Sequence, residues 1–169
     1  MPRNIQGLKM IHLFPDQQGK CACRCGQPLP PRRRRWATKD CEAKAVRHLL
    51  ILKGDSDAVR KAVFERDKGV CARCGIDCPK ISRACVQRWA YNCTREQIQA
   101  ADDLRLKYMR LGYPHPTNSG KSWWNADHVE PVAEGGRNSL SNFQTLCVVC
   151  HKRKTAEQAA RKALTRRRK

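Results

Sequence analysis

Asp127, His128 and His151 carry the elements of metal-assisted chemistry within 25 residues of the sequence. A carboxylate oxygen binds divalent cations, and a neighbouring imidazole can accept a proton near neutral pH. A second histidine, 23 residues after the first, can bind the same ion from another structural element. The combination outlines a hydrolytic site in which one set of groups holds an ion and another activates water.

Two cysteine pairs with the same spacing frame this segment. Cys71-x-x-Cys74 precedes it and is followed by Gly75, whereas Cys147-x-x-Cys150 lies directly before His151. A two-residue gap lets both thiolates face one zinc ion, and the glycine permits the tight turn. Because 72 residues separate the pairs, a shared zinc would join distant segments of the chain instead of closing one hairpin.

Each of these features has a simpler interpretation when taken alone. An isolated Asp-His dipeptide is commonly a surface feature, and a histidine after Cys-x-x-Cys can itself bind zinc or interact with a helix end. The combination with Gly135-Gly136, Asn142 and both cysteine pairs favours the catalytic interpretation.

Together these residues resemble the HNH endonucleases, the ββα-metal family, in the version that carries two Cys-x-x-Cys pairs. The matching stretches cover about half of the chain and are Val70–Gly75, Asp127–Val132, Gly135-Gly136, Ser139–Cys147 and Cys150–Thr155. The resemblance implies an α+β protein: a small zinc-stabilised ββα-metal core with added helices and an N-terminal zinc-binding module.

The same resemblance assigns roles to single residues. It implies that His128 is the general base, that Asp127 and His151 bind the catalytic ion, and that Asn142 fixes the loop and the orientation of the base. Water and substrate oxygens would complete an octahedral shell of Mg²⁺ or Mn²⁺, with Ni²⁺ or Zn²⁺ as alternatives because one ligand is a histidine. Since adjacent strand residues face opposite sides, we expect a bend or bulge at the Asp-His dipeptide.

A second group of thiols lies near the N-terminus. Cys21, Cys23 and Cys25 fall within five residues, and Cys41 follows sixteen positions later. This segment resembles the small zinc module that precedes some HNH domains, including those fused to annealing helicases. That module has a cysteine where this chain has Ala37, so Cys21 or Cys23 must replace it as a ligand of a second zinc. The alternative is a set of unligated thiols in a flexible arm.

Two basic clusters are candidates for contact with phosphate. One is a run beside Trp36, formed by Arg32, Arg33, Arg34 and Arg35. The other follows His151 and consists of Lys152, Arg153 and Lys154. Arginine pairs bidentately with phosphate oxygens, which favours a nucleic-acid contact. A solvated loop and a solvated helix face are the respective alternatives.

The composition indicates a polyanionic partner. Over 169 residues the formal net charge is +20, 30% of residues are charged and 6% are aromatic. With so few aromatic and so many charged residues, the apolar core must be thin, and a thin core usually needs disulfides or metal ions to stabilise it. The positive charge favours nucleic acid as the partner. We expect DNA, without excluding RNA, and no membrane partner, because the chain lacks a long basic amphipathic helix with aromatic anchors.

The sequence also suggests a cellular compartment and a kind of genome that could encode the protein. The start shows no apolar leader, and no stretch approaches the roughly 20 apolar residues of a membrane span. We therefore place the chain in a reducing cytoplasm, where its eleven cysteines favour metal ligation over disulfides. A small basic HNH protein is also compatible with coding by a phage or mobile element. The sequence does not distinguish a monomer from a homodimer.

We divide the chain into a flexible arm (1–20), a zinc module with a helix (21–54), a nuclease domain (55–164) with a helical insertion (76–122), and a basic tail (165–169). Apolar spacing and capping residues predict helices from Asp40 to Leu52, from Ser56 to Asp67, and from the Thr94 cap to Gly112. A strand over the Asp-His dipeptide should pair with one at Phe143–Leu146, and the next helix should carry His151 through Leu164. We interpret Cys78, Cys85 and Cys93 as buried or free thiols, and His48 as a packing histidine.

The sequence thus predicts a metal-dependent HNH endonuclease that hydrolyses DNA phosphodiester bonds by nicking or double-strand cleavage. The alternative is a catalytically inactive, zinc-stabilised module that binds nucleic acid.

Overall fold

The computed structural model describes residues 7–86, 92–117 and 121–167. The start of the expected arm, two pieces of the expected insertion and the end of the basic tail lie outside the described residues. The chain divides into two units, which are described separately: unit 1 holds residues 1–61 and 130–142, and unit 2 holds residues 62–129 and 143–169. Among the described residues, none of the helices has the length and apolar character needed to cross a membrane.

Unit 1 contains α1 (Met10–Leu13) and α2 (Lys39–Lys53). Thr38 caps α2 by accepting a hydrogen bond from the Cys41 amide, and Gly54 ends the helix with a left-handed φ of 78°. Both ends agree with the helix expected from the sequence.

A small cluster of buried side chains surrounds the N-terminal thiols in unit 1. Its buried members are Cys21, Ala22, Trp36, Ala37, Cys41 and Ala45. Phe14, from the segment expected to form an arm, packs edge-on against Trp36 and His48 with ring centroids 5.6 and 6.0 Å apart. His48 therefore has the packing role that the sequence suggests. With so few apolar side chains, this cluster depends on whatever holds the thiols together.

The rest of unit 1 is a loop with two 3₁₀ turns, η3 (Val132–Glu134) and η4 (Leu140–Asn142). Gly135 ends the first turn at a φ of 105°. The backbone at Gly136 passes so close to Glu130 that a Cβ atom would lie 1.9 Å from the Glu130 carbonyl oxygen. Only glycine fits there.

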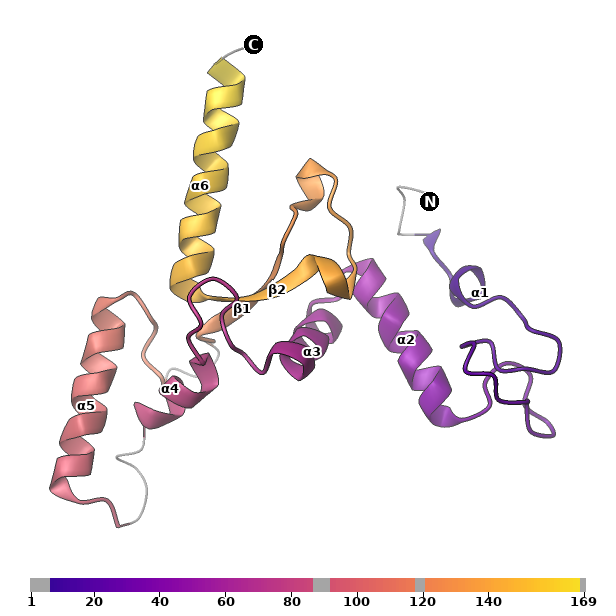
Figure 1. The fold of residues 1–169 in the computed structure, drawn as a ribbon, viewed down its shortest axis with the longest axis horizontal. Coiled ribbons are helices and arrows are strands. Elements are labelled where there is room, and N and C mark those ends of the chain that lie inside the picture. The colour runs from indigo at the N-terminus through magenta and orange to yellow at the C-terminus, as the bar shows by residue number, and fades with distance from the viewer. Residues whose placement is uncertain (1–6, 87–91, 118–120, 168–169) are drawn as a thin grey trace. The chain divides into compact units, whose positions relative to one another are not determined.

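Unit 2 is built on two short antiparallel strands followed by a helix (Figure 1). Strand β1 (Trp124–His128) pairs with β2 (Phe143–Cys147), and α6 (Val148–Arg167) begins at the next residue. The register runs without interruption from Trp124 opposite Cys147 to His128 opposite Phe143. The order strand, strand, helix confirms the expected α+β core. Of the bend or bulge expected at the Asp-His dipeptide, the bulge was wrong, because every residue of β1 has one partner on β2.

Buried contacts hold β2 in place within unit 2. Helix α3 (Ser56–Asp67) spans the boundary between the units, and its end reaches the strand. Asp67 Oδ2 accepts hydrogen bonds from the amide and hydroxyl of the fully buried Thr145, while Arg66 donates to Asp67 and to the Phe143 carbonyl. The Arg66 guanidinium, followed in importance by Thr145, lowers the pKa of Asp67.

The segment between the two cysteine pairs forms two helices, α4 (Cys78–Ala84) and α5 (Arg95–Arg110). Thr94 and Gln97 form the expected capping box of α5. Helix α4, which Asp77 caps, was not predicted from the sequence. Cys78 and Cys85 are fully buried free thiols, as expected, and burial raises the pKa of Cys78 to about 12.

The apolar face expected on α5 is covered in part. Tyr108 packs with Tyr113 and Trp123, and their ring centroids lie 4.8 to 5.5 Å apart. Ile98 and Leu111, expected on the same face, are exposed. The aromatic contacts therefore anchor one end of α5 to the rest of unit 2.

Candidate active site

Asp127 and His151 approach each other from β1 and the first turns of α6. Asp127 Oδ1 lies 3.6 Å from His151 Nε2, and the two side chains are 17% and 37% exposed. Two donor atoms that each bind one ion at about 2.1 Å can be up to about 4.2 Å apart. The 3.6 Å between these two atoms is therefore compatible with a single divalent cation bound by both. Their exposure leaves room for water and substrate oxygens, and a carboxylate with an imidazole suits the metals expected from the sequence.

The second oxygen of Asp127 has other partners. Oδ2 accepts hydrogen bonds from Lys154 Nζ and, at 3.4 Å, from Gln144 Nε2. Lys154 also donates to the carbonyl oxygens of His128 and Val129. Lys154 therefore contacts the end of β1, whereas the sequence suggested that it contacts phosphate. Lys152 and Arg153 are exposed on the same helix, where the sequence expected them.

His128 is the last residue of β1, directly opposite Phe143. The two rings pack with centroids 4.3 Å apart. Because the pairing is regular, the side chains of Asp127 and His128 leave the strand on opposite faces. His128 is half-buried, so its imidazole sits at the strand end, held by the phenyl ring and open to solvent.

Asn142 closes the loop of unit 1. Its Oδ1 accepts from the Glu130 amide at 2.9 Å, and its Nδ2 donates to the Glu130 and Arg137 carbonyls at 3.0 and 2.9 Å. These bonds place Asn142 where it can fix the loop, as the resemblance implies. Its effect on the orientation of His128 stays a prediction.

Four thiols of unit 2 converge from three segments: Cys71, Cys74, Cys147 and Cys150. Their sulfur atoms all lie within 4.8 Å of one another. Four thiolates at about 2.3 Å from a tetrahedral zinc are about 3.8 Å apart, and the Cys74 and Cys147 sulfurs are separated by 3.8 Å. The Ala72 amide also donates to the Thr145 carbonyl. This group could hold a structural zinc that ties the first pair to β2 and α6.

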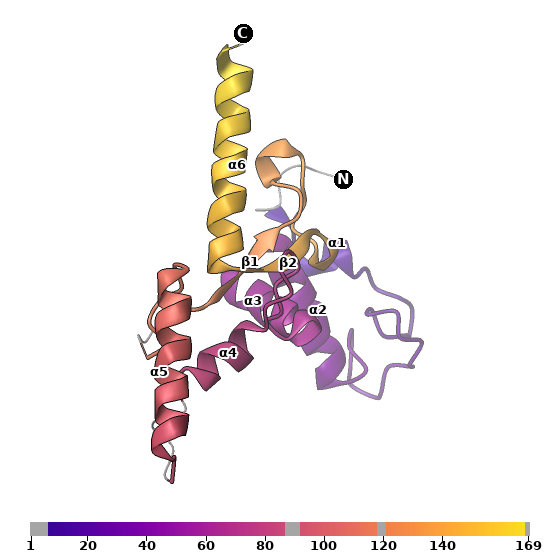
Figure 2. The same cartoon turned by 60° about the vertical axis from the view of Figure 1, so that its left-hand side comes forward.

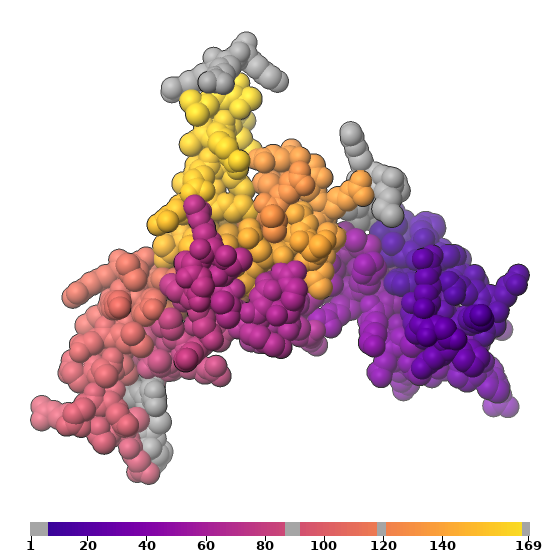
Figure 3. All heavy atoms as spheres, viewed as in Figure 1, coloured from indigo at the N-terminus to yellow at the C-terminus, as the bar shows by residue number. Residues whose placement is uncertain are grey.

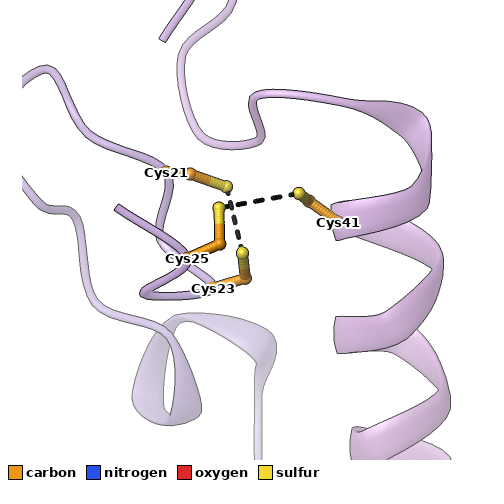
Figure 4. Close-up of side chains that lie close together, drawn as sticks. All are labelled: Cys21, Cys23, Cys25 and Cys41. Carbon is orange, nitrogen blue, oxygen red and sulfur yellow. Dashed lines mark hydrogen bonds between the residues drawn. The ribbon is translucent and has the colours of Figure 1, made fainter. Parts of the chain in front are cut away.

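The N-terminal thiols form a second group of the same kind (Figure 4). Cys21, Cys23 and Cys25 lie on one turn and face Cys41 on α2, with all four sulfurs within 4.8 Å. The sequence left open whether Cys21 or Cys23 replaces the missing ligand at Ala37; both belong to the group. A hydrogen bond from the Thr38 hydroxyl, the leading cause, lowers the pKa of Cys41 to about 7, whereas burial raises the pKa of Cys23 to about 12. Cys41 is therefore more easily ionised than Cys23.

The arginine run of unit 1 separates into two kinds of residue. Arg32, Arg33 and Arg34 are exposed. Arg35 instead donates from Nη2 to the Phe14 carbonyl at 2.6 Å, and its guanidinium lies 5.6 Å from the Trp36 ring centroid. Arg35 therefore packs within the module, although its place in the arginine run had suggested a phosphate contact.

Comparison with known proteins defines the class. Residues 117–157 match the family model for HNH endonuclease. Together with the relatives below, this match shows that the chain belongs to the HNH endonuclease family, which confirms the resemblance seen in the sequence.

The similar proteins found are all forms of one protein, ZRANB3. The DNA annealing helicase and endonuclease ZRANB3 is 32% identical over 160 residues in Mus musculus and 31% identical over 162 residues in Homo sapiens. Each alignment covers 90% of this chain but 15% of the relative, so the chain spans a small part of those proteins. The crystal structure of the human ZRANB3 HNH domain is 33% identical, covers 67% of this chain and 97% of that chain, and gives a TM-score of 0.43.

Proposed function

We propose that this chain is a metal-dependent endonuclease that hydrolyses DNA phosphodiester bonds. The observation that carries the proposal is the pair of metal-binding atoms, Asp127 Oδ1 and His151 Nε2, 3.6 Å apart on adjoining elements of the ββα core. A carboxylate and a neutral imidazole leave most of the coordination shell of a hard divalent ion open. An open shell is what substrate oxygens require.

The residues divide the work of phosphodiester hydrolysis. Asp127 and His151 would hold Mg²⁺ or Mn²⁺, with Ni²⁺ or Zn²⁺ as alternatives. When bound, the ion supplies stabilisation of negative charge on the phosphate and on the departing 3′ oxygen. We assign to His128 the removal of a proton from the attacking water, because it directly follows the metal ligand Asp127 at the end of β1 and its imidazole is half-exposed. Packing on Phe143 limits the rotation of the His128 ring.

Charge supports a nucleic-acid substrate. The chain carries a net charge of +20, and Lys152 and Arg153 are exposed on the helix that carries His151. The space-filling view shows α6 projecting from the other parts of unit 2 (Figure 3). Arg32, Arg33 and Arg34 add an exposed basic segment in unit 1. The ZRANB3 relatives are described as acting on DNA, which favours DNA over RNA.

Cleavage of supercoiled plasmid by the purified chain tests the proposal. We expect nicked or linear product with Mg²⁺ or Mn²⁺ and none with excess chelator. The variant Asp127→Asn, which removes one charge at almost unchanged volume, should lose at least about a hundredfold in rate, the scale of a lost general electrostatic contribution. The matched control is Asp103→Asn, an exposed carboxylate on α5.

Equal cleavage by Asp127→Asn and the parent would contradict the proposal. Salt-sensitive DNA binding by the chain, without cleavage in the presence of any of the four ions, would also contradict the proposal, because an inactive binding module behaves in this way. Cleavage of RNA in preference to DNA would reject the proposed substrate.

A further inference from the structure

The ammonium group of Lys154 lies among three oxygen atoms at the end of β1. These are Asp127 Oδ2, the His128 carbonyl oxygen and, at 3.3 Å, the Val129 carbonyl oxygen. A lysine ammonium has three N–H donors, so the three acceptors account for its donors. The side chain is 17% exposed, unlike the exposed Lys152 and Arg153 beside it.

This arrangement gives the two oxygens of Asp127 different surroundings. Lys154 and Gln144 donate to Oδ2, whereas Oδ1 faces His151 Nε2 at 3.6 Å. A carboxylate held in this way presents one oxygen to an ion next to the histidine. Rotation that would bring both oxygens to the ion breaks a charge-assisted hydrogen bond, which is among the stronger contacts in proteins.

The helix explains why Lys154 reaches this place. His151 and Lys154 are three residues apart on α6, so they share one face of the helix. That face meets Asp127 near the end of β1, and α6 itself begins beside the strand pair in both ribbon views (Figures 1 and 2). The same turn of helix therefore supplies one metal-binding atom and the group that orients the other.

We propose that Lys154 is a positioning residue that holds Asp127 as a one-oxygen ligand and thereby selects small six-coordinate ions over Ca²⁺. The inference rests on the proposed metal-dependent function. Mg²⁺ demands octahedral geometry at about 2.0–2.1 Å, while Ca²⁺ takes six to eight oxygens and accepts both oxygens of a carboxylate. Releasing Oδ2 should thus favour Ca²⁺ relative to Mn²⁺.

Metal binding by the zinc-loaded chain tests this without relying on cleavage. Mn²⁺ affinity is measured from the electron paramagnetic resonance signal of free Mn²⁺, and Ca²⁺ affinity from competition against it. Loss of Mn²⁺ binding in Asp127→Asn identifies the site. In Lys154→Met we expect the ratio of the Ca²⁺ to the Mn²⁺ dissociation constant to fall about tenfold, the scale of one hydrogen bond to a charged group.

Lys162→Met is the matched control, because Lys162 is exposed further along α6; its ratio should equal that of the parent. If Lys154→Met does not fold, Lys154→Gln is held to the same criterion. An unchanged ratio in a folded Lys154 variant overturns the inference, even if the variant binds DNA more weakly. Absence of Mn²⁺ binding by the parent chain overturns the inference as well, whereas the proposed function is judged separately by plasmid cleavage with each of the four ions.

Discussion

Asn142 binds the backbone of Glu130 twice, accepting from its amide at 2.9 Å and donating to its carbonyl at 3.0 Å. The side-chain amide thus pairs with Glu130 as an opposite strand residue would. Glu130 is two residues after His128, and Asn142 directly precedes β2. The bond pair closes the loop that leads from the end of β1 to the start of β2.

Replacing Asn142 should loosen this loop. In Asn142→Ala the Glu130 amide and carbonyl lose their partner, so we expect a loss of about 1–2 kcal/mol in the free energy of unfolding and slower cleavage. Chemical denaturation and the plasmid assay measure the two effects. Ser141→Ala, which removes an exposed hydroxyl bonded to Ser139, is the control. Parental stability in Asn142→Ala would show that the bonds contribute nothing.

Gly136 should tolerate no side chain. The Cβ of Gly136→Ala would meet the Glu130 carbonyl oxygen at 1.9 Å and the Asn142 amide nitrogen at 2.9 Å, so the loop has to move. We expect a loss of about 1–3 kcal/mol, as for an overpacked site. Gly7→Ala, where no atom lies within 4 Å of the added carbon, should change little. A melting temperature equal to the parent's in Gly136→Ala would contradict the loop geometry.

Zinc content should follow the two thiol groups separately. We expect the parent to hold about two zinc ions, one in each group of four cysteines. Cys25→Ser and Cys150→Ser should each lose one ion, measured by mass spectrometry of the metal. Cys150→Ser should also lose the cooperative melting of unit 2, because its zinc would join Cys71 to the start of α6. Two retained ions in either variant would be inconsistent with these ligand sets.

The carboxylate of Asp67 should stabilise the fold above acidic pH. Its pKa is lowered in the folded protein, chiefly by Arg66 and also by Thr145. The contribution is therefore fully present above the ordinary pKa of an aspartate and is lost as the pH falls through the lowered value. Asp67→Asn should cost about 1–2 kcal/mol at pH 7, and the difference from the parent should shrink towards pH 2.

Denaturation curves across this pH range measure the effect. Asp57→Asn, an exposed carboxylate on the same helix, should show a smaller loss. A penalty for Asp67→Asn that stays constant from pH 7 to pH 2 would exclude the ionised carboxylate as its source.

Short-range signals predicted most of the helices. Thr38 and Gly54 bound α2, and Thr94 begins α5, because capping depends on residues within a few positions. Helix α4 was not predicted because its seven residues are too few to show a periodic apolar face. Its one signal is an aspartate cap with Pro79 in the first turn.

The candidate site was predictable in its members but not in its geometry. The family resemblance names Asp127, His128 and His151. It does not give the strand register, which places Gln144 opposite Asp127 and Phe143 opposite His128. Likewise, helical spacing puts Lys154 on the face of His151, whereas its contact with the carboxylate depends on how α6 packs against β1.

The central claim, that His128 activates water beside an ion held by Asp127 and His151, is tested most directly by plasmid cleavage with His128→Ala. The variant is compared with the parent at saturating Mg²⁺ or Mn²⁺, after metal analysis has shown equal zinc content. We predict that cleavage falls at least about a hundredfold, as for loss of a general base, while DNA binding is retained. Cleavage at the parental rate by a zinc-replete His128→Ala variant would contradict the account.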